Sequence, residues 1–125
     1  GVVFGPHPRD FSKKLNKKTA ALAFRRALSE KLAAGAVVVA DGLEAIEPKT
    51  KTVAALLKKV AGGKAALFVT GAANANLNRA ARNLPKTEVT TAAQASVYQI
   101  LRYPTILVDA AGLDGLTKRL AEGAE

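Results

Sequence analysis

The 125-residue sequence predicts an α/β fold of three layers, α/β/α, in which helices cover both faces of a four-stranded, mainly parallel, Rossmann-like sheet. Short apolar segments alternate along the chain with segments of helical period, and the connections between them are short. Most of the apolar segments do not alternate with polar residues, which is typical of parallel strands that are covered on both faces. The length and the 49% of hydrophobic residues suit one globular domain.

Residues 1–14 are expected to form an extended basic arm, and residues 15–125 the globular domain. Pro6 and Pro8 favour extended backbone in the arm, because proline restricts its own φ and excludes the preceding residue from helical geometry. The arm is therefore predicted to be irregular rather than packed against the domain.

The first half of the domain is expected to contain a helix, a strand and a second helix. The first helix, over residues 16–34, has a core stripe at helical spacing, made of Ala21, Phe24, Leu28 and Leu32. If this helix extends back to Lys14, a basic strip lies beside the stripe, made of Lys14, Lys18 and Arg25. The β-branched run 36–40 predicts a strand buried on both faces. The helix after Pro48 is expected to bury Val53, Leu56, Leu57 and Val60.

The second half continues the alternation. Strand 65–70 precedes a helix that begins near Asn74, a favourable N-cap residue, and ends before Pro85. A weaker strand over 88–91 is followed by a short helix over 96–103 whose inward residues are Val97, Ile100 and Leu101. Strand 105–108 ends at Asp109, and the last helix is expected to bury Leu113, Leu116 and Leu120.

Composition and motifs exclude several classes of site. The chain has no cysteine for disulfides, thiolate nucleophiles or thiolate-bound zinc, and one histidine, His7, cannot form a multi-histidine site. No dinucleotide-binding glycine motif is present, and Gly62-Gly63-Lys64 follows a helix rather than a strand, so we interpret it as a helix stop. We expect no catalytic residue, metal, cofactor or small-molecule substrate. No apolar run reaches the ~20 residues of a membrane span, so we expect no membrane partner and a soluble, intracellular protein.

Basic residues concentrate at the start of the chain. The net charge is +9, and residues 1–31 contain eight Lys or Arg against two acids, a clustering that indicates a polyanion ligand. Aromatic and basic side chains interleave there, which favours RNA. The candidate phosphate contacts are Arg9, Lys13, Lys14, Lys17, Lys18 and Arg25, and the candidate stacking residues are Phe4, His7 and Phe11. Arg79 and Arg82 form a further pair on the third helix, and Tyr98 and Arg102 are spaced for a stacking contact.

A run of motifs resembles a known family. Residues 3–12, VFGPHPRDFS, followed by KKL and KK at 13–18, closely resemble the segment of bacterial large-subunit ribosomal protein L-four that follows its long extended loop. The likeness continues through EPKTK at 47–51, ARNLP at 81–85 and the segment 97–103, in the same order and spacing. The resemblance covers essentially the whole chain; the first motif is specific, and the others are strong only together.

The resemblance implies a structural, non-enzymatic component of the large ribosomal subunit that binds large-subunit ribosomal RNA, contacts neighbouring ribosomal proteins and supports assembly. Cytoplasmic and organelle ribosomes both fit. It adds Gly5, Ser12, Lys49 and Lys51 to the expected RNA-binding residues. Gly1 corresponds to the returning limb of the family's loop, so the family's N-terminal part and most of its loop are expected to be missing here. Lining of the peptide exit tunnel is therefore not expected of these residues.

Two alternatives stay open from the residues. A small Rossmann-like nucleotide-binding enzyme would have its pocket at Asp41, Gly71 and Asp109, where strands end. An RNA-binding repressor of translation or transcription, acting off the ribosome, is compatible with the first function. Because the sequence has no methionine, we expect Gly1 to be a processed end, an engineered start or the first residue of a fragment.

Overall fold

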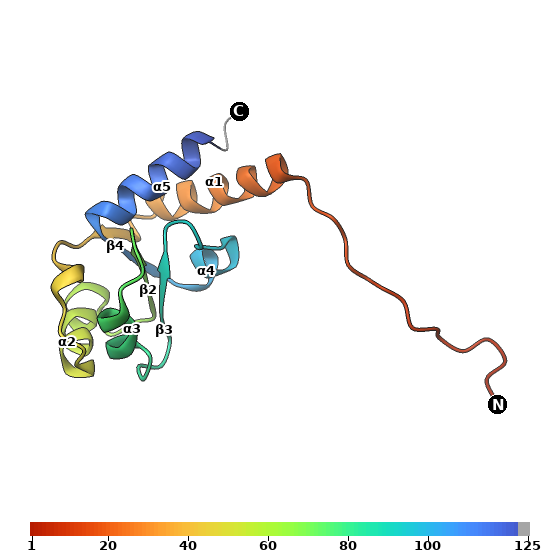
Figure 1. The fold of residues 1–125 in the computed structure, drawn as a ribbon, viewed down its shortest axis with the longest axis horizontal. Helices are drawn as coiled ribbons and strands as arrows, with labels where there is room; N and C mark the ends of the chain where they lie inside the picture. The colour runs from red at the N-terminus through yellow and green to blue at the C-terminus, as the bar shows by residue number, and fades with distance from the viewer. Residues whose placement is uncertain (123–125) are drawn as a thin grey trace.

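Four parallel strands form the centre of the protein, which a computed structural model describes over residues 1–122 (Figure 1). They are β1 (Val37–Val39), β2 (Ala66–Thr70), β3 (Thr87–Thr91) and β4 (Thr105–Val108). Their order in the sheet is β1-β4-β2-β3, and all three pairings are parallel. The predicted fold class is confirmed.

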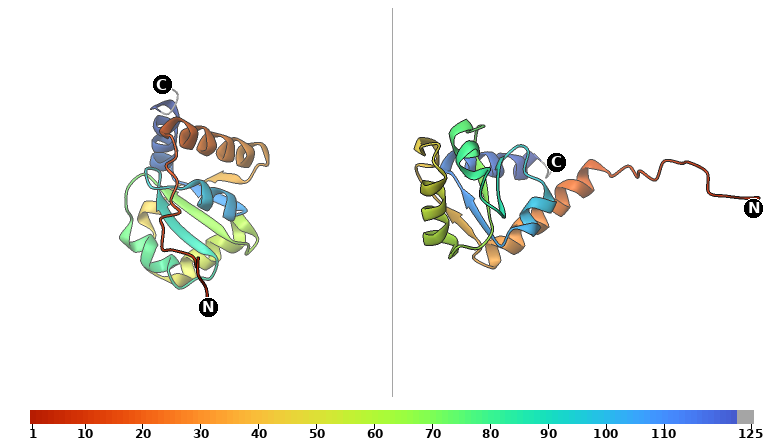
Figure 2. Two further views of the ribbon diagram at one scale, coloured as in Figure 1. Left: turned by 90° about the vertical axis from the view of Figure 1, so that its right-hand side faces the viewer. Right: turned by 90° about the horizontal axis from the view of Figure 1, so that it is seen from below.

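Helices cover both faces of this sheet, as Figures 1 and 2 show. One layer contains α1 (Lys17–Ala33), α4 (Val97–Arg102) and α5 (Ala110–Glu122), which pack with Leu67 and Val69 of β2. The other contains the 3-10 turn η1 (Leu43–Ala45), α2 (Thr50–Ala61) and α3 (Ala75–Ala81), which pack with Ala66 and Phe68. Successive residues of β2 thus enter opposite cores, because side chains alternate across a strand.

The expectation that residues 36–40 are buried on both faces is wrong. In the structure β1 pairs with β4 alone and lies at the edge of the sheet, and the side chain of Val39 is 52% exposed. The strands buried on both sides are β2 and β4, which occupy the two central positions. An unalternating β-branched run marks a strand but does not fix its place in the sheet.

The predicted inner face of α1 is partly wrong. The buried residues are Phe24, Ala27 and Leu28, and Leu32 is exposed. Lys31 takes the inward position one turn after Leu28, and its Nζ donates to the carbonyl oxygen of Tyr103, at the end of α4, at 2.8 Å. The helix begins at Lys17, so Lys14 lies outside it and the predicted strip of Lys14, Lys18 and Arg25 does not form.

Two further leucines were predicted inward and are exposed. Leu101 lies on α4, of which Ile100 is the buried residue, and Leu113 lies on α5, beside the buried Gly112 and Leu116. Both helices turn a narrow stripe toward the sheet, so the residue next to that stripe remains in solvent. Asn74 does cap α3 as predicted, since its side-chain oxygen accepts from the N–H of Asn76 and of Leu77, each at 3.1 Å.

Helix α5 packs against the end of β2 at backbone distance. A Cβ built on Gly112 would lie 2.7 Å from the carbonyl oxygen of Val69, and one built on Gly71 would lie 2.7 Å from the Cβ of Ala111. Contacts below 3.0 Å require atoms to move, and here one of those atoms belongs to the backbone of a central strand. Glycine at 112 therefore allows α5 to lie directly on the carboxyl end of β2.

Arg119 fastens α5 to the turn that precedes α4. Its Nη1 donates to the carbonyl oxygens of Ala92 and Ala95, at 2.9 and 2.8 Å. Its guanidinium carbon lies 4.1 Å from the ring centroid of Phe24 on α1. One cation therefore links α1, α5 and the loop after β3.

We expect Gly112→Ala to lower the free energy of unfolding by about 2 kcal/mol, because an overpacked site costs roughly 1–3 kcal/mol. Alanine in an unhindered helix would instead add about 1 kcal/mol of stability. Urea unfolding measures the change, with Asp114→Ala on the exposed side of α5 as the control. An unchanged or higher stability of Gly112→Ala would show that α5 does not approach β2 this closely.

Arg119→Ala is expected to lower the free energy of unfolding by about 2 kcal/mol, since it removes charged hydrogen bonds to two carbonyl groups. Lys118→Ala, which removes an exposed cation from the neighbouring position, should change stability by less than about 0.5 kcal/mol. Thermal unfolding of both variants at the same ionic strength makes the comparison. Equal losses would mean that net charge, and not the bonds of Arg119, sets the effect.

Candidate nucleic-acid interface

Residues 1–16 contain no helix or strand and extend away from the body as an arm (Figure 1). The side chains of Phe4 and Phe11 are 96% and 71% exposed. Exposed aromatic rings on an extended segment are unfavourable in water and available for contact with a partner. The irregular backbone continues through Asn16, two residues past the proposed boundary of the arm.

The middle of the arm has local order of its own. The carboxylate of Asp10 accepts from the N–H of Ser12 at 2.8 Å and from its hydroxyl at 2.6 Å. These two bonds, the hydroxyl first, lower the pKa of Asp10 below its usual 3.8. The guanidinium of Arg9 lies 4.1 Å from the ring centroid of Phe11. Residues 9–12 thus hold one cation and one ring in a fixed relation on the exposed arm.

The arm joins α1 at a helix end that lacks favourable charge. Asn16 is the N-cap residue but makes no side-chain cap bond, and the first turn contains no acid. That turn begins with Lys17 and Lys18, although the positive end of the helix dipole disfavours cations. An anion bound here would relieve the repulsion among these charges.

The basic residues of the arm have no acidic partner within the described part of the chain. The ion pair recorded there joins Lys49 to Glu47 at 2.7 Å, and both side chains are largely exposed. The unpaired cations of the arm and the first turn are Arg9, Lys13, Lys14, Lys17 and Lys18. The arm is thus a strip of free positive charge, which is the electrostatic footprint of a polyanion site.

Arg25 is placed differently from the other candidates. It is half-buried, and its Nη2 donates to the carbonyl oxygen of Leu120 on α5 at 2.6 Å. Together with Lys31 and Arg119 it connects helices of the α1-α4-α5 layer. In the sequence, a cation that joins two helices differs from a solvated one only in lying one turn away from buried apolar residues. Many solvated cations have the same spacing. The sequence analysis therefore missed the roles of Lys31 and Arg119.

The remaining candidates lie on other parts of the body. Lys49 and Lys51 are exposed at the start of α2, while Arg79 and Arg82 are exposed at the end of α3. The structure therefore divides the predicted residues into an arm group and a group on the α2-α3 layer. Tyr98 and Arg102 do lie together, with the guanidinium 5.7 Å from the ring centroid.

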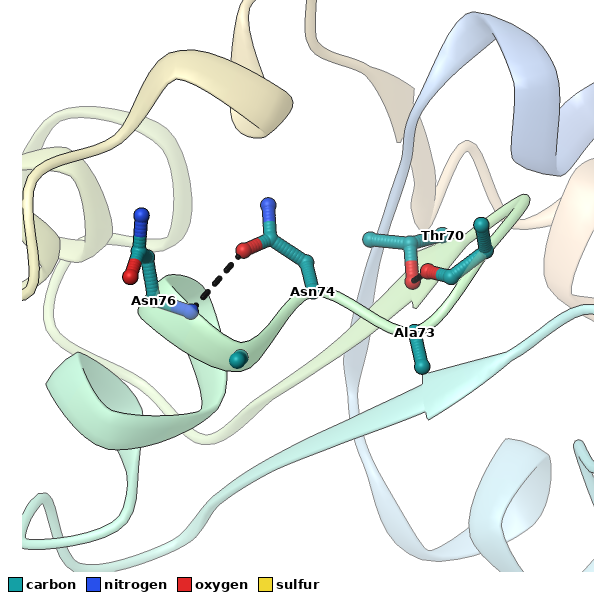
Figure 3. Close-up of a pocket in the computed structure, with 6 residues that line it drawn as sticks. Thr70, Ala73, Asn74 and Asn76 are labelled. Atoms are coloured by element: carbon teal, nitrogen blue, oxygen red, sulfur yellow. Dashed lines mark hydrogen bonds between the residues drawn. The ribbon is translucent and has the colours of Figure 1, made fainter.

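A hollow of about 300 Å³ lies beside the carboxyl end of β2, lined by Thr70 and residues 72–76 (Figure 3). Two of its polar side chains are used within the protein, since the hydroxyl of Thr70 donates to the carbonyl oxygen of Ala72 at 2.7 Å, and Asn74 caps α3 and donates from Nδ2 to the carbonyl oxygen of Leu43 at 3.0 Å. None of its lining residues is charged. Asp41, Gly71 and Asp109, where the enzyme alternative would have its pocket, do not line it.

The two aspartates that the enzyme alternative placed at its pocket also do not form a site. Asp109 is buried at the end of β4, with Oδ2 lacking a hydrogen-bond partner, and Asp41 is exposed. Within residues 1–122 no three His, Asp or Glu side chains gather as metal ligands. None of the helices described there has the length and apolar character to cross a membrane.

Comparisons with known proteins agree with the motifs of the arm. Residues 1–119 match the model of the ribosomal protein L4/L1 family. The chain is 44% identical over 108 residues to the large ribosomal subunit protein uL4 of Desulforudis audaxviator, which covers 86% of this chain and 52% of that protein. It is 40% identical over 122 residues to uL4 of Nitratidesulfovibrio vulgaris, a match that covers 95% of this chain and 57% of that protein. For uL4 of Magnetococcus marinus the identity is 36% over 121 residues, and the match covers 97% of this chain and 58% of that protein.

The chain spans about half the length of the curated relatives that it matches. The matched region includes the whole arm, the four strands and the two helical layers, α5 as far as Arg119. With a family model that covers nearly all of its residues, the chain belongs to the ribosomal protein L4/L1 family.

Proposed function

We propose that the chain is a structural, non-enzymatic component of the large ribosomal subunit, and that large-subunit ribosomal RNA is its ligand. The observation that carries this proposal is the exposed arm, whose cations have no acidic partner in the described residues. Membership of the ribosomal family supports the same assignment. The α/β body acts as a platform that holds the arm and presents its own surfaces.

Binding divides between phosphate contact and base stacking. The phosphate contacts come from Arg9, Lys13, Lys14, Lys17 and Lys18, with Gly5 and Ser12 allowing close approach of the backbone. Phe4, His7 and Phe11 stack on bases that RNA loops expose. Pro6 and Pro8 restrict the free arm, so less conformational entropy is lost when it docks.

Neighbouring ribosomal proteins are proposed to contact the α1-α4-α5 layer. This layer exposes large apolar side chains on all three helices, namely Leu22, Leu32, Tyr98, Leu101 and Leu113. Exposed apolar and aromatic side chains are typical of protein–protein contacts. The proposed location is the large subunit of a cytoplasmic ribosome, and an organelle ribosome fits the same chemistry.

We expect Lys13→Ala with Lys14→Ala to weaken binding to large-subunit ribosomal RNA about tenfold or more. The slope of log affinity against log salt should fall by about two, because each lost phosphate contact releases roughly one counterion fewer. Fluorescence anisotropy at several salt concentrations measures both quantities. Thermal unfolding should not change, since both side chains lie in the exposed arm.

The matched control is Arg26→Ala with Lys118→Ala, which also removes two exposed cations but from the body. This variant should keep the wild-type salt slope. Identical losses in the two variants would mean that net charge alone drives binding, and a salt-independent affinity of the wild-type chain would contradict the proposal. Saturable binding of a free nucleotide would favour the enzyme instead.

A further inference from the structure

Strand β3 has one edge that pairs with no other strand. It is the last strand in the order β1-β4-β2-β3, and its partner in the sheet is β2. The carbonyl oxygen of Lys86 and the N–H of Ala92 both bond to residues of β2, at 3.2 and 2.9 Å. Because the backbone groups of a strand point to alternate sides, Thr87, Val89 and Thr91 direct theirs away from β2. No hydrogen bond is recorded in the described chain for these three N–H groups, so β3 presents free donors at its outer edge.

The same edge presents acceptors and lacks the usual protection. The carbonyl oxygens of Thr87 and Val89 are free to accept, whereas that of Thr91 accepts from the N–H of Gln94 and of Ala95. Edge strands are commonly protected by a proline, a lysine or a bulge, and the sequence and register of β3 contain none of these. The other edge strand, β1, has three residues against five in β3. The edge of β3 is therefore the one on which a further strand can pair over more residues.

Two helices border this edge, one on each face of the sheet, and Figure 1 shows β3 between them. Helix α3 lies on one side, since Asn78 lines a hollow together with Val89 and Thr91 of β3. Helix α4 lies on the other side, where Nε2 of Gln99 donates to Oε1 of Glu88 at 2.7 Å. A strand added to β3 would lie between these helices and direct alternate side chains toward each of them.

The hollow between α3 and the carboxyl half of β3 has a volume of about 300 Å³ and adjoins the one drawn in Figure 3. Asn78, Thr91 and Gln94 contribute amide and hydroxyl groups to its lining, and Val89 contributes an apolar surface. None of its lining residues is charged. A small side chain of an added strand thus finds a recess of mixed polar and apolar character.

The charges around the edge favour an acidic segment. Arg82 lies one turn after Asn78 on the same side of α3, Lys86 directly precedes β3, and Arg102 ends α4. These three cations are exposed, and none takes part in an ion pair recorded within residues 1–122. They stand on both sides of the strand position that is open beside β3.

Glu88 cannot neutralise these cations. It is the one acid in the sequence of residues 48–108, against nine Lys or Arg. Its carboxylate accepts from Gln99, and burial followed by a hydrogen bond to this carboxylate raises the pKa of Tyr103. The negative charge that complements the edge must therefore come from a partner.

Other occupants suit this edge less well than an acidic peptide does. Two copies of this chain each carry a net charge of +9, and pairing β3 with β3 would bring these cations together. RNA would complement the charges but would leave the backbone groups of β3 without their natural partner. Donors and acceptors that alternate along an extended edge match another peptide backbone, which is the pattern used in strand addition.

We propose that the free edge of β3 binds an acidic, extended segment of another protein as a fifth strand of the sheet. The backbone of this segment pairs with Thr87, Val89 and Thr91, and its carboxylates face Arg82 and Arg102 on opposite sides of the sheet. The proposal goes beyond RNA binding by the arm and is independent of it, because none of these residues belongs to the arm.

The probes are two eight-residue peptides of threonine and valine that contain either four glutamates or four lysines. The charged residues stand in adjacent pairs, so that one of each pair faces each flanking helix. At saturation the acidic peptide should slow amide hydrogen exchange of the full chain, measured by NMR, about tenfold at Thr87, Val89 and Thr91. Exchange at Glu88 and Thr90, whose N–H groups face β2, should not change. The lysine peptide should not bind.

The edge variant carries Arg82→Gln with Arg102→Gln, and the matched control carries Lys51→Gln with Lys118→Gln, which removes two exposed cations from elsewhere. The edge variant should bind the acidic peptide about fivefold less tightly, because it loses two exposed ion pairs, while the control should bind it as the wild type does. An acidic peptide methylated on its backbone nitrogens keeps its charge but cannot pair as a strand, so it should not bind. Thermal unfolding confirms that both variants are folded.

Unchanged exchange at Thr87, Val89 and Thr91 in the presence of the acidic peptide overturns the proposal. Equal binding of the methylated peptide overturns it as well, and so does equal affinity of the edge variant and its control. If an RNA hairpin shifts the amide signals of this edge and the acidic peptide does not, the surface belongs to RNA and the proposal fails. The test of the arm with ribosomal RNA stands apart from all of these outcomes.

Discussion

Burial of β2 and β4 on both faces is the constraint on which the rest of the structure depends. Phe68 and Leu107 enter one core while Leu67 and Ile106 enter the other, so apolar helices must cover each side. The inward faces of the helices are apolar and pack against the sheet, so most charged side chains lie on the outer surfaces and on the arm. Where cations do reach the core boundary, they donate to backbone carbonyls, as Arg119 and Lys31 do.

Close packing at the carboxyl end of β2 makes the body a platform rather than a pocket. In open parallel sheets this end is the usual place for a small ligand. Here Gly112 brings α5 onto the backbone of Val69, and the adjoining hollow has no charged lining residue. The exposed cations available to a ligand lie elsewhere, on the arm and on the α2-α3 layer. The division suits a large, extended polyanion that contacts several surfaces.

The order of elements could be predicted because each local signal agreed with the fold. Asn74 capped its helix as expected, and the apolar runs at 65–70 and 105–108 became the central strands. Sheet order could not be predicted, so the edge position of β1 was missed. The face that α1 turns toward the core could not be predicted either. The small residue Ala27 is buried, which places Lys31 inward and leaves Leu32 exposed.

The candidate site was predictable in its arm and less so on the body. Aromatic and basic residues interleaved in the first eighteen positions carry a strong local signal. Arg25 and Lys18 are both cations of the basic N-terminal segment, so the sequence does not distinguish them. The hydrogen bond from Arg25 to Leu120 depends on the packing of α1 against α5, which are distant in sequence.

Backbone amide shifts of the full chain, recorded by NMR with and without a large-subunit ribosomal RNA fragment, test the central claim most directly. We expect the shifts to change along the arm and the first turn of α1, and to stay constant at Asp41, Gly71 and Asp109. Changes centred on those three residues, with the arm unaffected, would contradict the account that the arm binds RNA.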